Sequence, residues 1–79
     1  MTVLKKGVKP IMDSNKIAQR LKDLRENTYK PRRVVAEDLG ISESALTAYE
    51  MGARVPRDEI KIKLADYYET TVESIFFAD

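Results

Sequence analysis

Cysteine and histidine are both absent from the 79-residue sequence, and the two absences exclude several kinds of site. Without cysteine, the chain has neither a disulfide framework nor a cysteine-based zinc site to stabilise it. Without histidine, it lacks the usual imidazole base and the common sets of metal ligands, so we expect no metal site. Serine, threonine and tyrosine are present, but no activating base and no phosphate-binding glycine loop accompany them. We therefore expect neither an enzyme nor a cofactor.

Long apolar runs are missing as well. No segment approaches the roughly 20 apolar residues that span a bilayer. The N-terminus also lacks the apolar core and the cleavage site of a secretory signal. We therefore expect a soluble cytoplasmic protein with no membrane partner.

The net charge of +1 is too small to indicate a nucleic-acid partner, but its distribution along the chain is uneven. Residues 1–33 hold ten Lys and Arg against three acidic residues, a balance of +7. Residues 34–79 hold four Lys and Arg against ten acidic residues, a balance of −6. Such an asymmetry can give the folded molecule one cationic face. An ordinary solvated surface with unevenly spaced charges explains the composition equally well.

Apolar residues recur at helical spacing through most of the chain, which at this length is expected to form one domain. Residues 1–13 show no helical period and predict a flexible or extended arm, which places the folded domain at residues 14–79. Capping residues, glycines and prolines divide that domain into five short helices. The expected helices are Ser14–Asn27, Arg32–Leu39, Glu43–Met51, Arg57–Glu69 and a last short helix capped by Thr71. The predicted fold class is a compact all-α bundle.

Two details of these helices follow from local chemistry. Either Asp13 or Ser14 can accept hydrogen bonds from the first free backbone donors of the first helix. In the fourth helix, Ile60 and Leu64 begin an apolar stripe, and we expect Ile62 to broaden it.

Gly40 interrupts a run of residues that otherwise favours a helix. Glycine enters the left-handed conformation that commonly ends a helix, and Ser42 can cap a new helix two residues later. The two helices must therefore cross at a steep angle over a very short turn. Ala36 leaves room for their close approach, and Leu46 can reach back into the same contact. This spacing is the packing requirement of a helix-turn-helix, although other helical domains also contain glycine-stopped corners.

Four segments between Ile17 and Phe76 resemble the phage-repressor and Cro-like helix-turn-helix family, also called the Xre family. The segments are IAQRLKDLRE, VVAEDLGISESALTAYE, MGARVP and LADYYETTVESIF. The resemblance implies a lambda-repressor-like domain whose helix-turn-helix is formed by Arg32–Leu39 and Glu43–Met51. It also implies that the second of these helices, the recognition helix, enters the major groove of DNA.

The resemblance assigns structural roles to several residues. Arg25 and Glu50 match an ion pair that fastens the first helix to the recognition helix in family members, with two unrelated surface charges as the alternative. The other structural residues are Ala36, Gly40 and Leu46. A leucine is common at the position of Lys30, so we expect Tyr29 to supply the missing burial.

The DNA contacts that the resemblance implies lie on and around the recognition helix. Arg32 stands where the family usually has Gln, and it suits a phosphate contact because arginine is always charged and offers a two-pronged donor. The residues expected on the outward face of the recognition helix are Ser42, Glu43, Ser44, Thr47 and Ala48, and the resemblance implies that the last four face the bases. Arg54 is expected to contact a phosphate, with Arg33 and Lys30 as helpers. Glu43 fits a purely structural role equally well, since acidic residues stabilise the first turn of a helix.

From these roles we expect a sequence-specific DNA-binding transcriptional regulator of the repressor type. It would bind double-stranded DNA as a homodimer on a palindromic operator, with Phe77 or the arm supplying the dimer contact. An inducer or antirepressor would be a separate protein, because the chain has no room for an effector domain. The alternative is a protein-interaction module, such as an antitoxin-like or mobile-element accessory protein, and the absence of Lys and Arg from Glu43–Met51 favours it.

Overall fold

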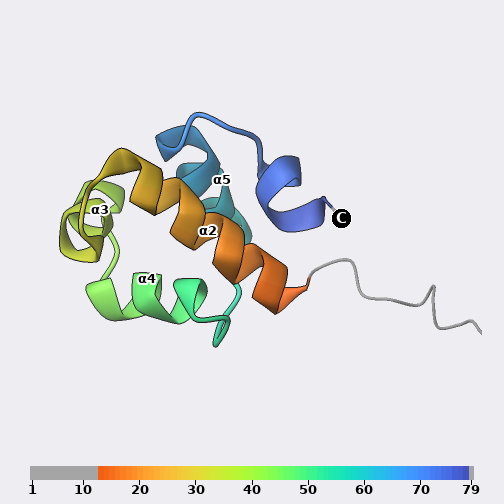
Figure 1. The fold of residues 1–79 in the computed structure, drawn as a ribbon, viewed down its shortest axis with the longest axis horizontal. Helices are drawn as coiled ribbons and strands as arrows, with labels where there is room; N and C mark the ends of the chain where they lie inside the picture. Colours follow the sequence, from red (N-terminus) through yellow and green to blue (C-terminus); the bar gives the residue numbers. More distant parts are fainter. Residues whose placement is uncertain (1–12, 79) are drawn as a thin grey trace, which may run out of the picture.

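Five helices follow one another in residues 13–78, the part of the chain that the computed structural model describes (Figure 1). They are α2 (Ser14–Thr28), α3 (Arg32–Leu39), α4 (Glu43–Glu50), α5 (Asp58–Tyr67) and the short π-helix η1 (Glu73–Phe77). This part contains no strand, which confirms the predicted all-α bundle of five short helices. The predicted arm, residues 1–13, lies outside the described residues except for Asp13. None of the helices in the described part is long and apolar enough to cross a bilayer.

Side-chain hydrogen bonds mark the first turns of α2 and η1. The Asp13 carboxylate accepts hydrogen bonds from the backbone N–H groups of Asn15 and Lys16, at 3.0 and 3.3 Å. Asp13 is therefore the residue that caps α2, and Ser14 is the first helical residue. At the other end of the chain, the Thr71 hydroxyl accepts a hydrogen bond from the Ser74 N–H at 3.1 Å, although Val72, and not the predicted Thr71, is the residue directly before η1.

The end of α5 differs from the expected boundary. The sequence predicted a helix over Arg57–Glu69, whereas α5 begins one residue later and ends two residues earlier, at Tyr67. Glu69 adopts a φ of 57°, which lies in the left-handed region and cannot continue a right-handed helix. The Thr70 N–H then donates back to the Ala65 carbonyl at 2.9 Å and satisfies part of the helix end.

Helix α2 runs through the middle of the fold, with α4 below it and α5 and η1 above it in the view of Figure 1. The hydrophobic core forms where these helices meet, and every helix contributes to it. Its buried residues are Ile17, Leu21, Val35, Ala36, Leu39, Leu46, Tyr49, Ile60, Leu64, Ala65, Ile75 and Phe76. A domain this small depends on each of these faces, because little apolar surface is available to replace a lost one.

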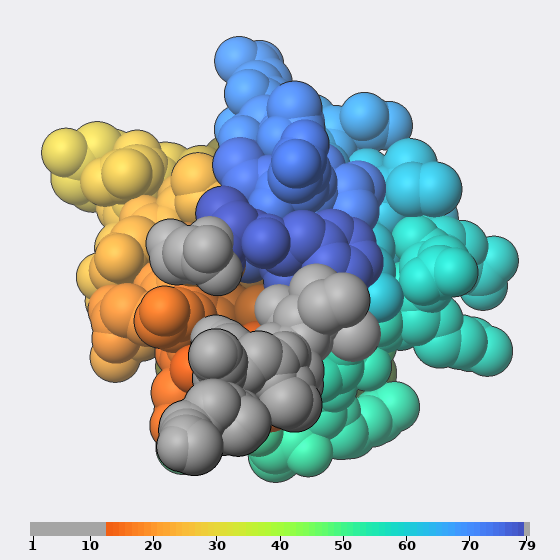
Figure 2. All heavy atoms as spheres, turned by 90° about the vertical axis from the view of Figure 1, so that its right-hand side faces the viewer, coloured from red at the N-terminus to blue at the C-terminus, as the bar shows by residue number. Residues whose placement is uncertain are grey.

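The short helix η1 closes the core at one side. Ile75 and Phe76 are each 1% exposed, so this last turn inserts its apolar side chains into the bundle. Figure 2 shows the C-terminal segment in dark blue at the surface, between the orange residues of α2 and the teal residues before α5. The end of the described chain is therefore part of the folded domain.

Two expectations about buried residues are wrong. Ile62 is 56% exposed, because a residue two positions from both Ile60 and Leu64 lies on the other side of the helix. Lys61 is buried in its place, with its ammonium 3.3 Å from Asp58 and its aliphatic stem packed inward. Tyr29 is 94% exposed and supplies no burial, since it ends α2 in the left-handed conformation and its side chain turns into solvent.

Candidate nucleic-acid interface

The turn between α3 and α4 is built on the backbone of Gly40. Gly40 has a φ of 74° and ψ of 30°, and the next N–H, that of Ile41, donates to the Ala36 carbonyl at 3.0 Å. This pattern ends α3 with its free carbonyl groups satisfied. Ser42 is extended, and its hydroxyl accepts a hydrogen bond from the Ala45 N–H at 3.0 Å, so α4 begins at once. The two helices remain separate elements joined by a two-residue connection beyond Gly40.

Helix α4 has one buried face and one face open to solvent. Leu46 and Tyr49 lie in the core, and Leu46 packs beside the buried Ala36 of α3. Of the residues predicted to lie on the outward face, Ser42, Glu43 and Ser44 are exposed, and Thr47 and Ala48 are half-buried. The outer face therefore begins fully open at the first turn of α4 and becomes partly covered further along the helix.

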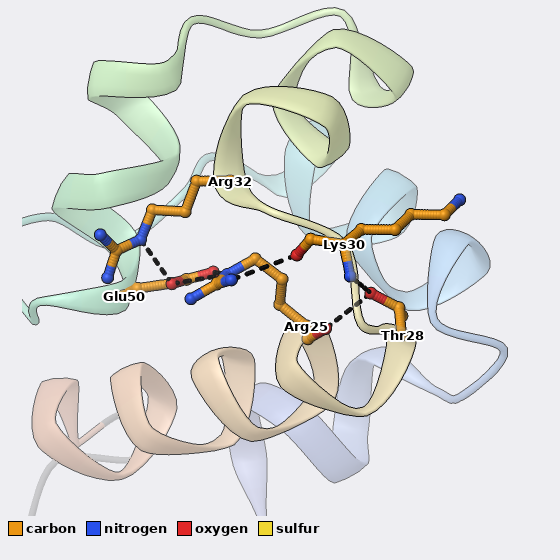
Figure 3. Close-up of polar contacts among 5 residues, drawn as sticks. All are labelled: Arg25, Thr28, Lys30, Arg32 and Glu50. Carbon is orange, nitrogen blue, oxygen red and sulfur yellow. Dashed lines mark hydrogen bonds and ion pairs between the residues drawn. The ribbon is translucent and has the colours of Figure 1, made fainter.

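Glu50, the last residue of α4, accepts hydrogen bonds from two arginines through its buried carboxylate (Figure 3). Its side chain is fully buried, and Arg25 Nε donates to both oxygens, at 3.0 and 2.8 Å. Arg32 Nε donates to Oε1 at 2.9 Å. A third bond from Arg25, from Nη1 to the Lys30 carbonyl at 3.2 Å, holds the connection between α2 and α3 in the same cluster. Three helices are thus fastened at one point.

The electrostatics of this cluster follow from its charge count. Two guanidinium groups share one carboxylate, so the cluster keeps one net positive charge. The hydrogen bond to Glu50 raises the pKa of Arg25 above its ordinary value, although burial opposes the shift. Tyr68 Oη is buried with no hydrogen-bond partner among residues 13–78, and burial together with the charge of Glu50 raises the pKa of its phenol. Arg25 therefore stays charged and Tyr68 stays neutral.

The other predicted phosphate contacts are exposed arginines. Arg33 lies exposed in the first turn of α3, next to Arg32. After α4, the chain turns at Gly52, which has a φ of 78°, and Arg54 follows in an exposed position. The guanidinium carbon of Arg54 lies 5.8 Å from the centre of the Tyr49 ring, a cation–π distance that draws this arginine back toward α4.

Lys30 is not brought together with Arg32. In Figure 3 its side chain points away from Arg32 and Glu50. Its ammonium lies 3.2 Å from Tyr67 Oη and 3.5 Å from the Asp38 carboxylate, and Tyr67 donates to the same carboxylate at 2.6 Å. Lys30 therefore belongs to a separate polar cluster between α3 and α5, beside a shallow pocket that Asp38 and Tyr67 help to line.

No pattern in the sequence predicts the pairing of Arg32 with Glu50. The two residues are 18 positions apart and meet only because α3 and α4 cross at the Gly40 turn. Within residues 13–78, no group of three or more acidic side chains is placed to hold a metal ion. The outer face of α4 and the arginines around it therefore offer hydrogen-bond donors, a few hydrogen-bond acceptors and permanent positive charge.

A comparison with protein-family models matches residues 16–75 to a helix-turn-helix domain. The match spans about three quarters of the chain and includes the Gly40 turn with all of α3 and α4. Comparisons with curated proteins and with solved structures give no match. On the strength of this match and of the geometry of the turn, the chain belongs to the helix-turn-helix domain family.

Proposed function

We propose that this chain is a sequence-specific DNA-binding regulator of the phage-repressor and Cro-like (Xre) type that inserts α4 into a major groove. Membership of the helix-turn-helix domain family indicates a DNA-binding regulator. One structural observation supports the insertion of α4 into the groove. The left-handed turn at Gly40 fixes the inner face of α4 in the core while Glu43 and Ser44 stay exposed at its first turn. Recognition helices use their N-terminal residues in this way to contact base edges.

The outer face of α4 has the chemistry needed to read bases. Glu43 can accept a hydrogen bond from the amino group of cytosine, and Ser44 and Thr47 can bond to either donor or acceptor edges. The methyl groups of Thr47 and Ala48 can contact the methyl group of thymine. These residues occupy successive turns of one short helix, so the proposed readout covers only a few base pairs in each half-site.

Phosphate contacts would come from the arginines that flank α4. The proposed contacts are Arg32, Arg33 and Arg54. Arg32 is bound to Glu50 through Nε alone, and its two Nη atoms make no hydrogen bond to any residue in the described part of the chain. Lys30 is left out of this surface because its ammonium lies beside Asp38 and Tyr67.

We further propose that two copies bind a palindromic operator and act as a repressor. Dimers of helix-turn-helix domains place their recognition helices roughly 34 Å apart, in successive major grooves. Phe77 is 41% exposed next to the core and offers one apolar contact between copies. In such an arrangement, an inducer or antirepressor would be a separate protein.

The test is selection of binding sites from a random duplex pool, followed by fluorescence anisotropy on the selected duplex. We expect a palindromic site, steep weakening of binding as salt rises, and weaker binding with less discrimination in Ser44→Ala. The matched control is Lys16→Ala. Lys16 is exposed and lies one helical turn before Arg20, on the side of α2 that faces η1, so its loss should leave discrimination unchanged. Equal affinity for random and selected duplex at moderate salt contradicts the proposal.

A second candidate function is a protein-interaction module, such as an antitoxin-like or mobile-element accessory protein. The observation that favours it is the charge of α4, which carries no Lys or Arg and exposes Glu43 at its start. For such a module, DNA affinity would be no greater than that of an acidic control domain. The same anisotropy experiment therefore separates the two functions.

A further inference from the structure

We propose that Glu50 is a positioning residue for DNA binding as well as a structural residue. It holds the guanidinium of Arg32 by Nε so that the opposite edge, which carries the two Nη atoms, is presented to a DNA phosphate. This inference rests on the proposed DNA-binding function and assigns Glu50 a part in it.

The geometry divides the Arg32 guanidinium into a held edge and a free edge. Nε donates to Glu50 Oε1 at 2.9 Å, whereas the Nη atoms make no hydrogen bond to residues 13–78. Figure 3 shows the two Nη nitrogens pointing away from the Glu50 carboxylate. The Glu50 side chain that binds Nε is fully buried, whereas the Arg32 side chain is 31% exposed, so part of Arg32 can reach solvent. A planar guanidinium with two free N–H-bearing atoms is suited to a two-pronged contact with a phosphate.

The carboxylate that holds Arg32 is itself fixed. Arg25 donates to both Glu50 oxygens, so the carboxylate cannot turn to follow a moving arginine. A free arginine loses much rotamer freedom when it is immobilised on a ligand, whereas a side chain already held in place loses less. The chain of Arg25, Glu50 and Arg32 therefore prepares the phosphate contact before DNA arrives.

An argument from net charge alone predicts the opposite change in DNA affinity when Glu50 is replaced. The direction of the measured change therefore tests the inference. A carboxylate near DNA repels phosphates, so replacing Glu50 with a neutral residue should strengthen binding if only net charge mattered. A role confined to folding would leave the affinity of the folded fraction unchanged. Of these three explanations, only the positioning of Arg32 predicts that loss of the Glu50 carboxylate weakens DNA binding.

The experiment measures binding of Glu50→Gln, Arg32→Lys and the double variant to the selected duplex, by anisotropy over a range of salt and below each melting temperature. Lysine keeps the charge but carries all its donors on one nitrogen, so it cannot offer one edge to Glu50 and a separate two-pronged edge to a phosphate. We expect each single variant to bind about tenfold more weakly, a change equivalent to roughly 1.4 kcal/mol. We also expect Glu50→Gln to flatten the salt slope by about one, as the loss of one phosphate contact does. The double variant should bind no more weakly than either single variant.

The matched control is Arg57→Lys, which changes an exposed arginine before α5 that has no ion pair within residues 13–78 and no place on the proposed DNA surface, and should shift affinity by less than about threefold. Unchanged or tighter binding of Glu50→Gln, or additive effects in the double variant, would overturn the inference while leaving the DNA-binding function intact. If Glu50→Gln does not fold, Arg32→Lys decides: affinity equal to that of the wild type overturns the positioning role. Absence of sequence preference in the wild type overturns both proposals together.

Discussion

Arg20 in α2 donates a hydrogen bond from Nη1 to the carbonyl oxygen of Ile75 in η1, at 2.8 Å. Its other terminal nitrogen, Nη2, donates to the Ala78 carbonyl, also at 2.8 Å. The carbonyl groups at the end of a short helix have no partner within the helix. The Arg20 side chain thus satisfies two of these carbonyl groups. It links α2 to residues that lie 55 and 58 positions later in the sequence.

We predict that Arg20→Ala lowers the free energy of unfolding by about 1–3 kcal/mol, the usual value for hydrogen bonds to a charged group. The loss should act through η1, whose Ile75 and Phe76 close the core. Urea unfolding followed by far-UV circular dichroism measures the change. Lys16→Ala removes an exposed charge of the same helix and should stay within about 0.5 kcal/mol of the wild type. Equal stability of the two variants would show that the Arg20 bonds do not hold η1.

The second prediction concerns the turn of the motif. Gly40→Ala should lower stability by about 1–2 kcal/mol, because a Cβ in the left-handed conformation clashes with its own backbone. A Cβ at this position would meet only Lys63 Nζ, at 4.0 Å, so the cost is one of backbone conformation and not of space. Gly40→Asn should cost less, since asparagine tolerates this conformation better. Urea unfolding of the pair checks the order, and an alanine variant as stable as the asparagine variant would contradict it.

Variants of Ser42 distinguish its capping of α4 from its place at the proposed DNA surface. Its hydroxyl caps α4 at Ala45, so Ser42→Ala should cost about 1 kcal/mol of stability, as the loss of an N-cap does. Ser42→Asp keeps a capping oxygen and should retain the stability, but it adds a negative charge at the proposed DNA surface and should weaken binding. Thermal unfolding and anisotropy on the same samples distinguish the two effects. An alanine variant with wild-type stability would remove the capping role.

The sequence predicted those parts of the fold that depend on local chemistry. The end of α3 at Gly40 and the capping of α4 by Ser42 depend only on neighbouring residues. Helix α3 has the predicted boundaries. The predicted burial of Ile62 is wrong, because helical spacing from Ile60 and Leu64 places this residue away from the apolar stripe.

Contacts between distant residues could not be read from the sequence. The bond of Arg32 to Glu50 depends on the crossing of α3 and α4, and the burial of Lys61 depends on the position of η1, whose Phe76 and Phe77 rings lie 5.8 and 5.5 Å from its ammonium. Each is set by the relative placement of whole helices. The family resemblance supplied Arg25 and Glu50 as a pair, but the second arginine on Glu50 is a property of this chain.

The last prediction concerns the pKa of Asp38 and the stability of the fold at acidic pH. The Asp38 carboxylate accepts a hydrogen bond from Tyr67 Oη at 2.6 Å, and this bond, helped by Lys30, lowers the pKa of Asp38 below its ordinary value of 3.8. Because the folded pKa lies below the unfolded one, the stabilisation is complete above the unfolded pKa and is lost as pH falls through the folded pKa. Tyr67→Phe should therefore raise the pKa of Asp38 toward 3.8, measured by an NMR titration of its carboxyl carbon.

The same variant should show a pH-dependent loss of stability. The difference in unfolding free energy between wild type and Tyr67→Phe should be largest near neutral pH and should shrink as pH falls below 3.8 and through the lowered pKa of Asp38, until Asp38 is protonated in both. Tyr29→Phe is the matched control, since Tyr29 is exposed and donates no hydrogen bond to the described residues, and it should change neither quantity. If the Asp38 titration is the same in Tyr67→Phe as in the wild type, the hydrogen bond from Tyr67 is not what depresses its pKa.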